Sequence, residues 1–362
     1  MYYGLLALLL ILSSAPSMGR NMSDPVYIEP FDRAAGGTVL TRATRDGILY
    51  GNPALLGLGK SWIRWAGFQT TPKITGDREN IQNLNDAVNG DNQTDDAGGE
   101  GGSEGIDLDL LSVIDVGTGF EFNLAFMNRN GGGGVFADAG LYADYSDFGN
   151  TGIPGAKIVT DVLGGAAISG AYAVTRWLHL GATQKMLYGS SKELVLTPLN
   201  FEQVSEEVQD VTSLGTGMGT DFGALLYFQD YTIDYALGLT AQNLVPVEFS
   251  DGAYPTLPQM YNLGLGIAFH TASNVIHLSA ELNDLQATSA EPQKRRLHVG
   301  ARLLIWERFG LAVGLYNDKP SFGIKADLTI LAIGLSYYNK VIGFNENSFE
   351  RDEITFTISA GI

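Results

Sequence analysis

The chain ends in EITFTISAGI (residues 353–362), where every second residue from Ile354 to Ile362 is apolar. Threonine, serine and glycine occupy the positions between. This period of two predicts a β-strand with one apolar face and one polar or small face. We expect such regularity in a terminal strand only where another strand pairs with it. A closed barrel provides that pairing, because its last strand pairs with its first and no backbone group stays unsatisfied.

The same alternation recurs along most of the chain. In MYNLGLGIAFH (260–270), Leu263 and its apolar partners alternate with Asn262 and small residues. Such segments are about eight to eleven residues long, and a membrane-spanning strand needs about nine to eleven. Strands of soluble proteins average about five or six residues. The pattern therefore predicts an all-β fold, a transmembrane antiparallel β-barrel of about fourteen strands over residues 59–362, with its first strand at 60–71.

Aromatic residues lie near the ends of these segments. A membrane barrel carries aromatic girdles where its wall meets the two membrane–water interfaces. We expect the following residues to belong to such girdles: Tyr231, Tyr254, Trp306, Phe309, Tyr316 and Tyr338.

Composition excludes several other classes of protein. The 362 residues are 45% hydrophobic and 17% charged, with a formal net charge of −18. A chain so acidic is repelled by nucleic acid. There is no cysteine, so disulfides and thiolate metal sites are excluded. Beyond the N-terminus, no uninterrupted apolar run is long enough for a membrane helix.

Residues 1–19 are typical of a signal peptide. The apolar stretch LLALLLIL (5–12) is too short to span a bilayer, and SMG (17–19) offers small residues for cleavage. Lysine and arginine are absent before the apolar stretch, and a buried N-terminal strand or helix is the alternative. An exported barrel without cysteine indicates the outer membrane of a Gram-negative cell, with outer-membrane lipid as its surroundings.

Residues 72–116 form a distinct acidic insertion. The stretch is rich in Asp, Asn, Glu and Gly. Between residues 77 and 115, Arg78 is the single basic residue among many acidic ones. This composition predicts a solvated loop rather than part of the fold. A calcium site is the alternative, although the spacing matches neither the EF-hand loop nor the nonapeptide calcium repeat.

Charged residues occur at the positions that face inward in the predicted strands. Their signs are mixed, so they must pair across the lumen or contact water, because an isolated charge at membrane depth is costly. Structural ion pairing and contact with a substrate are both open for each of them. The lumen-lining candidates are Lys185, Asp221, Asp234, Glu281, Arg296, His298, Arg302, Lys325 and Asp327.

The sequence gives little support for catalysis. The four histidines, His179, His270, His277 and His298, fall on separate strands without the paired spacing of a metal site. No phosphate-binding loop occurs. We therefore expect no enzyme activity, no catalytic residues, no bound metal and no cofactor.

The segment before the first strand carries a family resemblance. It contains Gly36 and Gly37, then Ala43 and Asp46, and it closes with a rigid corner formed by Asn52, Pro53, Ala54, Leu55 and Leu56. This pattern resembles the N-terminal plug of FadL-like outer-membrane barrels, a superfamily that includes PorV-like and conjugal-transfer TraF-like proteins. The segments LHLGATQKMLYG, GLTAQNLVP and YNLGLGIAF are similar to strands of the latter two groups. The resemblance implies a plug over residues 20–58.

Two functions are open at this point. The plug and the small inward residues favour passive uptake of small, mostly hydrophobic molecules, with the plug gating the path. The resemblance to PorV-like and TraF-like barrels favours a non-conducting scaffold or shuttle component of a secretion, conjugation or surface-assembly system. The expected partner is accordingly a small apolar ligand or a partner protein of such a system.

Overall fold

The structure is a computed structural model. It describes residues 23–42, 47–58, 64–76, 115–128, 130–147, 154–196, 214–289, 292–306, 308–328, 330–342 and 349–360. The expected signal peptide and most of the acidic insertion lie outside these residues, so both stay predictions. In the described part of the chain, no helix has the length and apolar character needed to cross a membrane.

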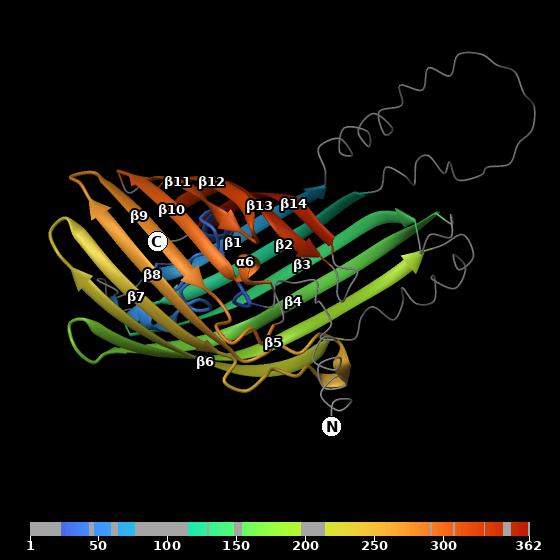
Figure 1. Cartoon of the computed structure of the whole chain (residues 1–362), viewed down its shortest axis with the longest axis horizontal. Coiled ribbons are helices and arrows are strands. Elements are labelled where there is room, and N and C mark those ends of the chain that lie inside the picture. Colours follow the sequence, from blue (N-terminus) through green and yellow to red (C-terminus); the bar gives the residue numbers. More distant parts are fainter. Residues whose placement is uncertain are drawn as a thin grey trace, which may run out of the picture.

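Two short helical elements precede the strands, and the strands dominate the fold (Figure 1). The elements are α2 (Pro30–Ala34), η1 (Pro53–Leu58), β1 (Arg64–Gly76), β2 (Asp115–Met127), β3 (Gly131–Asp147), β4 (Pro154–Ala173), β5 (Leu178–Leu196), β6 (Gly215–Gln229), β7 (Ile233–Gln242), η4 (Ser250–Gly252), β8 (Met260–His270), β9 (Asn274–Leu282), α6 (Gln293–Arg296), β10 (Leu297–Ile305), β11 (Phe309–Tyr316), β12 (Lys319–Asp327), β13 (Leu331–Ile342) and β14 (Phe349–Ala360).

Each strand pairs antiparallel with its neighbour in sequence, and β14 pairs with β1. The strands form one sheet that closes on itself as a barrel. The terminal strand thus has partners on both sides: Ile358 is paired with Ile333 of β13 and with Thr70 of β1. The all-β antiparallel barrel predicted from the alternation is confirmed.

The side chains of the wall are arranged in the opposite sense to those of a soluble protein. Large apolar side chains point outward, and Leu265, Val313 and Phe322 are 57%, 56% and 55% exposed. Polar side chains such as Asn262 and Thr355 point inward and are buried. The wall therefore has an apolar outer surface wherever its side chains are described, and such a surface is stable in an apolar solvent, because contiguous exposed apolar area drives association in water.

Several predicted boundaries are wrong. The first strand runs from Arg64 to Gly76 rather than over 60–71, of which 60–63 lie outside the described residues. The insertion is shorter than 72–116, because Gly76 pairs with Val116 at the far end of the β1–β2 ladder. Strands β3, β4 and β5 have 17, 20 and 19 residues, more than a bilayer requires. Turn-forming and acidic residues in these three strands take part in strand pairing, although in the sequence they suggest that the strand has ended.

The expected aromatic girdles are half right. Tyr231, Trp306 and Phe309 are exposed, but Tyr254, Tyr316 and Tyr338 are buried inside the barrel. Tyr316 and Tyr338 lie on the inward polar face, where their hydroxyls have partners: Tyr316 donates to Asp24 at 2.6 Å, and Tyr338 bonds Arg33 and Glu353. Tyr254 lies in the connection between β7 and β8 and packs against Phe249. Proximity to a strand end does not specify which face a ring occupies.

Candidate functional site

The barrel interior contains the N-terminal part of the chain (Figure 1, blue). We call residues 23–42 and 47–58 the luminal segment. Most of its side chains are buried, and they contact inward residues of the wall. Its helix α2 begins with Pro30, which is favoured in the first turn. The helix ends at Ala34, and the chain then turns at Gly36 and Gly37, whose φ angles of 73° and 74° suit glycine.

Two ion pairs join α2 to the last strands of the barrel. Glu29 contacts Lys325 of β12 at 3.0 Å, and Asp32 contacts Arg302 of β10 at 2.8 Å. Arg302 also donates to the backbone oxygen of Thr38. Lys325 and Arg302 were both candidates from the sequence, and the structure assigns them to the luminal segment. Ion pairing inside the barrel, rather than an open pore lining, accounts for their positions.

Arg33 is bonded to another part of the wall, formed by β13, β2 and β3. Its guanidinium donates to Glu121 of β2 at 2.5 Å and to the hydroxyl of Tyr338 at 2.8 Å, and it lies 3.9 Å from Asp138. Burial alone would lower the pKa of Arg33, but its anionic neighbours, Glu121 first, raise it well above the ordinary value. The arginine therefore stays charged at any physiological pH. Helix α2 thus contributes both a cation and an anion to ion pairs with the wall.

Glu281 of β9 binds the backbone of the luminal segment. Its two carboxylate oxygens accept hydrogen bonds from the N–H groups of Val39 and Leu40 at 2.9 and 2.8 Å. Nearby, the hydroxyls of Ser279 and Thr38 are 2.7 Å apart. A carboxylate that satisfies two successive amides fixes irregular backbone that no strand can pair with.

His298 holds the segment where α2 ends. Its Nδ1 lies 2.8 Å from the carbonyl oxygen of Gly36, and its Nε2 lies 3.3 Å from Asp24. The ring is fully buried. The hypothesis that His298 lines the lumen is thus compatible with its inward direction, but its contacts are with the segment itself.

The corner predicted at residues 52–56 is buried against β5 and β6. Asn52 donates to the carbonyl of Leu40 at 2.7 Å and accepts from the N–H of Ala54 at 3.1 Å. A Cβ at Gly181 would overlap Pro53 and Ala54, and one at Gly223 would overlap Asn52. The glycines therefore form the seat of the corner. Leu55 and Leu56, buried in η1, complete it, whereas Ala43 and Asp46 lie outside the described residues.

Lys185 and Asp221 have a different role from the other inward charges. They pair at 2.8 Å, and both bind Asn243, which has a φ of 49° just after β7. Asn243 in turn donates to the carbonyl of Pro258 at 3.0 Å. The pair thus anchors the base of the β7–β8 connection, whose Phe249 and Tyr254 pack inside the barrel. Nothing local in the sequence singles out Asn243.

The remaining candidates are placed as follows. Asp234 accepts from Tyr227 and lies 2.7 Å from Nε2 of His270. Arg296 is not on an inward strand position, because it ends helix α6 and donates to the carbonyl of Asp284 at 2.5 Å. Asp327 is partly buried at the end of β12. No group of three or more histidine or acidic side chains in the described ranges is arranged to hold a metal ion.

The close contact between the luminal segment and the wall can be tested by a substitution. A Cβ at Gly300 would overlap the backbone carbonyl of Ala35, which cannot rotate away. We expect Gly300→Ala to displace the segment and to destabilise its docked state by roughly 1–3 kcal/mol, as overpacking does. Limited proteolysis within residues 23–42 would report the displacement. Gly334→Ala is the control, because its nearest neighbours lie at 3.4 Å or more; equal proteolysis of the two variants would contradict the fit.

Comparisons with known proteins bear on this architecture. No protein-family model and no curated protein sequence matches the chain. The solved toluene transporter TbuX of Ralstonia pickettii is similar in structure, with a TM-score of 0.54, 15% identity and coverage of 94% of this chain and 98% of TbuX. The toluene transporter TodX of P. putida has a TM-score of 0.48, 16% identity and coverage of 94% and 99%. A Pseudomonas aeruginosa FadL homologue has a TM-score of 0.36 and 12% identity, with coverage of 96% of this chain and 99% of the homologue.

The barrel shares its fold with TbuX. This conclusion rests on the similarity to TbuX along nearly the whole of both chains. At 15% identity the similarity concerns the fold alone. The PorV-like and TraF-like features expected from short strand motifs stay predictions.

Proposed function

We propose that the protein is an outer-membrane barrel for passive uptake of small, mostly hydrophobic molecules. The fold shared with TbuX, described as a toluene transporter, supports the proposal. The apolar outer surface of the wall is the surface that outer-membrane lipid would cover. The proposal involves no catalytic step and no cofactor.

The observation that carries the proposal is the luminal segment itself. In the described residues, hydrogen bonds, ion pairs and packing hold it, and the chain has no cysteine that could fix it covalently. Such contacts can be exchanged one by one as the segment shifts. A segment that fills a barrel and can move gives a gated path.

The contact between the segment and the wall includes apolar and aromatic surface that suits apolar molecules. Tyr27, Tyr50 and Phe136 form an aromatic group with ring centroids 4.9 to 5.6 Å apart. Phe249 and Tyr254 of the β7–β8 connection belong to the same buried cluster. When the segment shifts, these rings offer apolar and aromatic surface to a passing molecule, since aromatic pairs are favourable in offset and edge-to-face geometries.

A reversible cross-link tests this proposal. The hydroxyls of Thr38 and Ser279 are 2.7 Å apart, so the double variant Thr38→Cys/Ser279→Cys is expected to form a disulfide between the segment and β9. We expect cells carrying the oxidised variant to accumulate a radiolabelled apolar solute no faster than cells without the barrel. Reduction should restore the wild-type rate, because the chain contains no other cysteine. The single variants control for the substitutions.

Deletion of residues 20–57 is the companion measurement. The truncated barrel is expected to conduct ions in planar bilayers, and the intact protein to conduct far less. If the oxidised, reduced and truncated forms all behave alike while remaining folded, the uptake proposal fails. The scaffold alternative would then be preferred, although the fold comparison gives it no support.

A further inference from the structure

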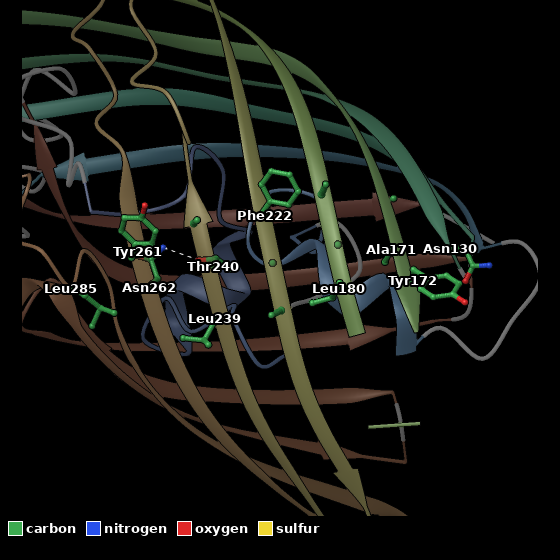
Figure 2. A pocket seen from close by; sticks show the side chains of 16 residues that line it. Asn130, Ala171, Tyr172, Leu180, Phe222, Leu239, Thr240, Tyr261, Asn262 and Leu285 are labelled. Carbon is green, nitrogen blue, oxygen red and sulfur yellow. Dashed lines mark hydrogen bonds between the residues drawn. The ribbon is translucent and has the colours of Figure 1, made fainter. Parts of the chain in front are cut away.

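A groove of about 780 Å³ crosses the outer face of β4 to β8. Figure 2 shows its side chains following one another from Asn130 and Tyr172 at one end to Tyr261 and Leu285 at the other. Its larger apolar members are all exposed on the outer surface: Tyr172, Leu180, Phe222, Leu239, Tyr261 and Leu285. The groove therefore belongs to the surface that faces lipid, not to the lumen.

Small outward residues make the groove deep. Ala182, Ala224 and Ala241 line it between the larger side chains. The register places Ala182 opposite Phe222, and Phe222 opposite Ala241, so the groove runs across the strands. From β4 to β8 it crosses four strand spacings, about 19 Å at about 4.8 Å each. The four ladders from β4–β5 to β7–β8 are continuous beneath it, so it is a closed trough with no opening through the wall.

The surroundings determine what fills the trough. In a bilayer, an apolar trough of this size holds neither vacuum nor water, because water needs polar partners there. Polar groups occur at its ends, where Asn130 and the hydroxyl of Tyr261, bonded to Gln259, are found. A long, narrow trough with an apolar middle fits a chain-like molecule better than a compact ring.

We propose that this groove binds one acyl chain of a bilayer lipid. The inference rests on the membrane location of the barrel and does not depend on uptake through it. The groove lies directly behind the corner of the luminal segment, because Gly181 and Gly223 line the groove and also seat Asn52 and Pro53 on the inner side. Asn52 lies 3.4 Å from the carbonyl oxygen of Ala224. A bound chain thus covers the part of the wall against which the corner rests.

Native mass spectrometry of the full chain released from lipid nanodiscs tests the proposal. The wild type is expected to retain one more phospholipid than Ala241→Phe or Ala224→Phe, in which a ring fills the trough. Ala280→Phe is the matched control, because Ala280 is an exposed outward residue of β9 outside the groove. The control should retain as much lipid as the wild type. Equal retention by all four proteins would overturn the proposal.

A second measurement needs no variant. A phospholipid with a diazirine in its acyl chain should label wild-type peptides from β5 to β7, and Ala241→Phe should lose that label. Labelling spread evenly around the barrel would overturn the proposal. So would retention of added toluene in place of lipid, which would indicate a site for a free solute. Loss of the retained lipid with dissociation of a dimer would equally overturn it, since the groove would then be an interface between two copies.

Discussion

Replacing Arg33 by methionine is expected to weaken docking of the luminal segment by about 3–5 kcal/mol, the usual cost of removing one partner of a buried ion pair. The substitution leaves Glu121 and Asp138 buried beside an apolar side chain. Amide hydrogen exchange in residues 30–37 should become at least about a hundredfold faster, because exchange there follows opening of the segment. Neither carboxylate can reach bulk water without that opening.

Two further variants separate charge from loss of packing. Adding Glu121→Gln to Arg33→Met should recover part of the loss, because it neutralises the stranded carboxylate while Asp138 keeps Lys340 at 3.8 Å. Lys294→Met removes an exposed ion pair between Lys294 and Asp318. The Lys294 side chain is 66% exposed and that of Asp318 is 41% exposed. Water and salt screen such an exposed pair, so its loss should leave docking of the segment almost unchanged. If Arg33→Met and Lys294→Met had the same effect, helix α2 would not be held by its charges.

The barrel could be predicted from sequence because period two is a local property. The alternation through Leu263 and Leu265 assigns the outward face without knowledge of any partner strand, and the structure confirms that face. The inward direction of Lys185, Asp221, Glu281 and Arg302 follows from the same pattern. The alternation has a physical cause, because a barrel wall in lipid requires an apolar outer face at every strand.

What the sequence could not predict depends on contacts between distant residues. Arg296 fits the alternation of the following strand, but a four-residue helix places it before β10 begins. Tyr338 is expected near a strand end as a girdle residue, but β13 continues to Ile342 and Tyr338 bonds Arg33 and Glu353 inside the barrel. Asn243 anchors a connection only because β5 and β6 bring Lys185 and Asp221 together. Each of these requires knowing what occupies the lumen.

The same reasoning for the outer face gives the second large effect, which is expected for Leu265→Arg. Leu265 lies midway along β8, is 57% exposed, and pairs with the outward residues Leu237 and Ala280. A charge on the lipid face near the bilayer centre costs roughly 2–4 kcal/mol, because the guanidinium must leave water or distort the bilayer. The variant should therefore unfold at a lower urea concentration in phospholipid vesicles. The loss of heat-modifiable electrophoretic mobility measures the folded fraction.

The free-energy cost of a charge on the lipid face depends on its depth in the bilayer. This dependence makes the prediction specific to a wall that lies in a membrane. Leu297→Arg places the same charge at the first residue of β10, on a side chain that is 46% exposed and adjoins the basic residues of α6. Near an interface an arginine reaches the headgroups, and its cost falls to about 0–1 kcal/mol. Leu265→Ala controls for lost apolar area alone. In water both arginines would be equally well solvated, so equal destabilisation by Leu265→Arg and Leu297→Arg would show that no bilayer surrounds this face.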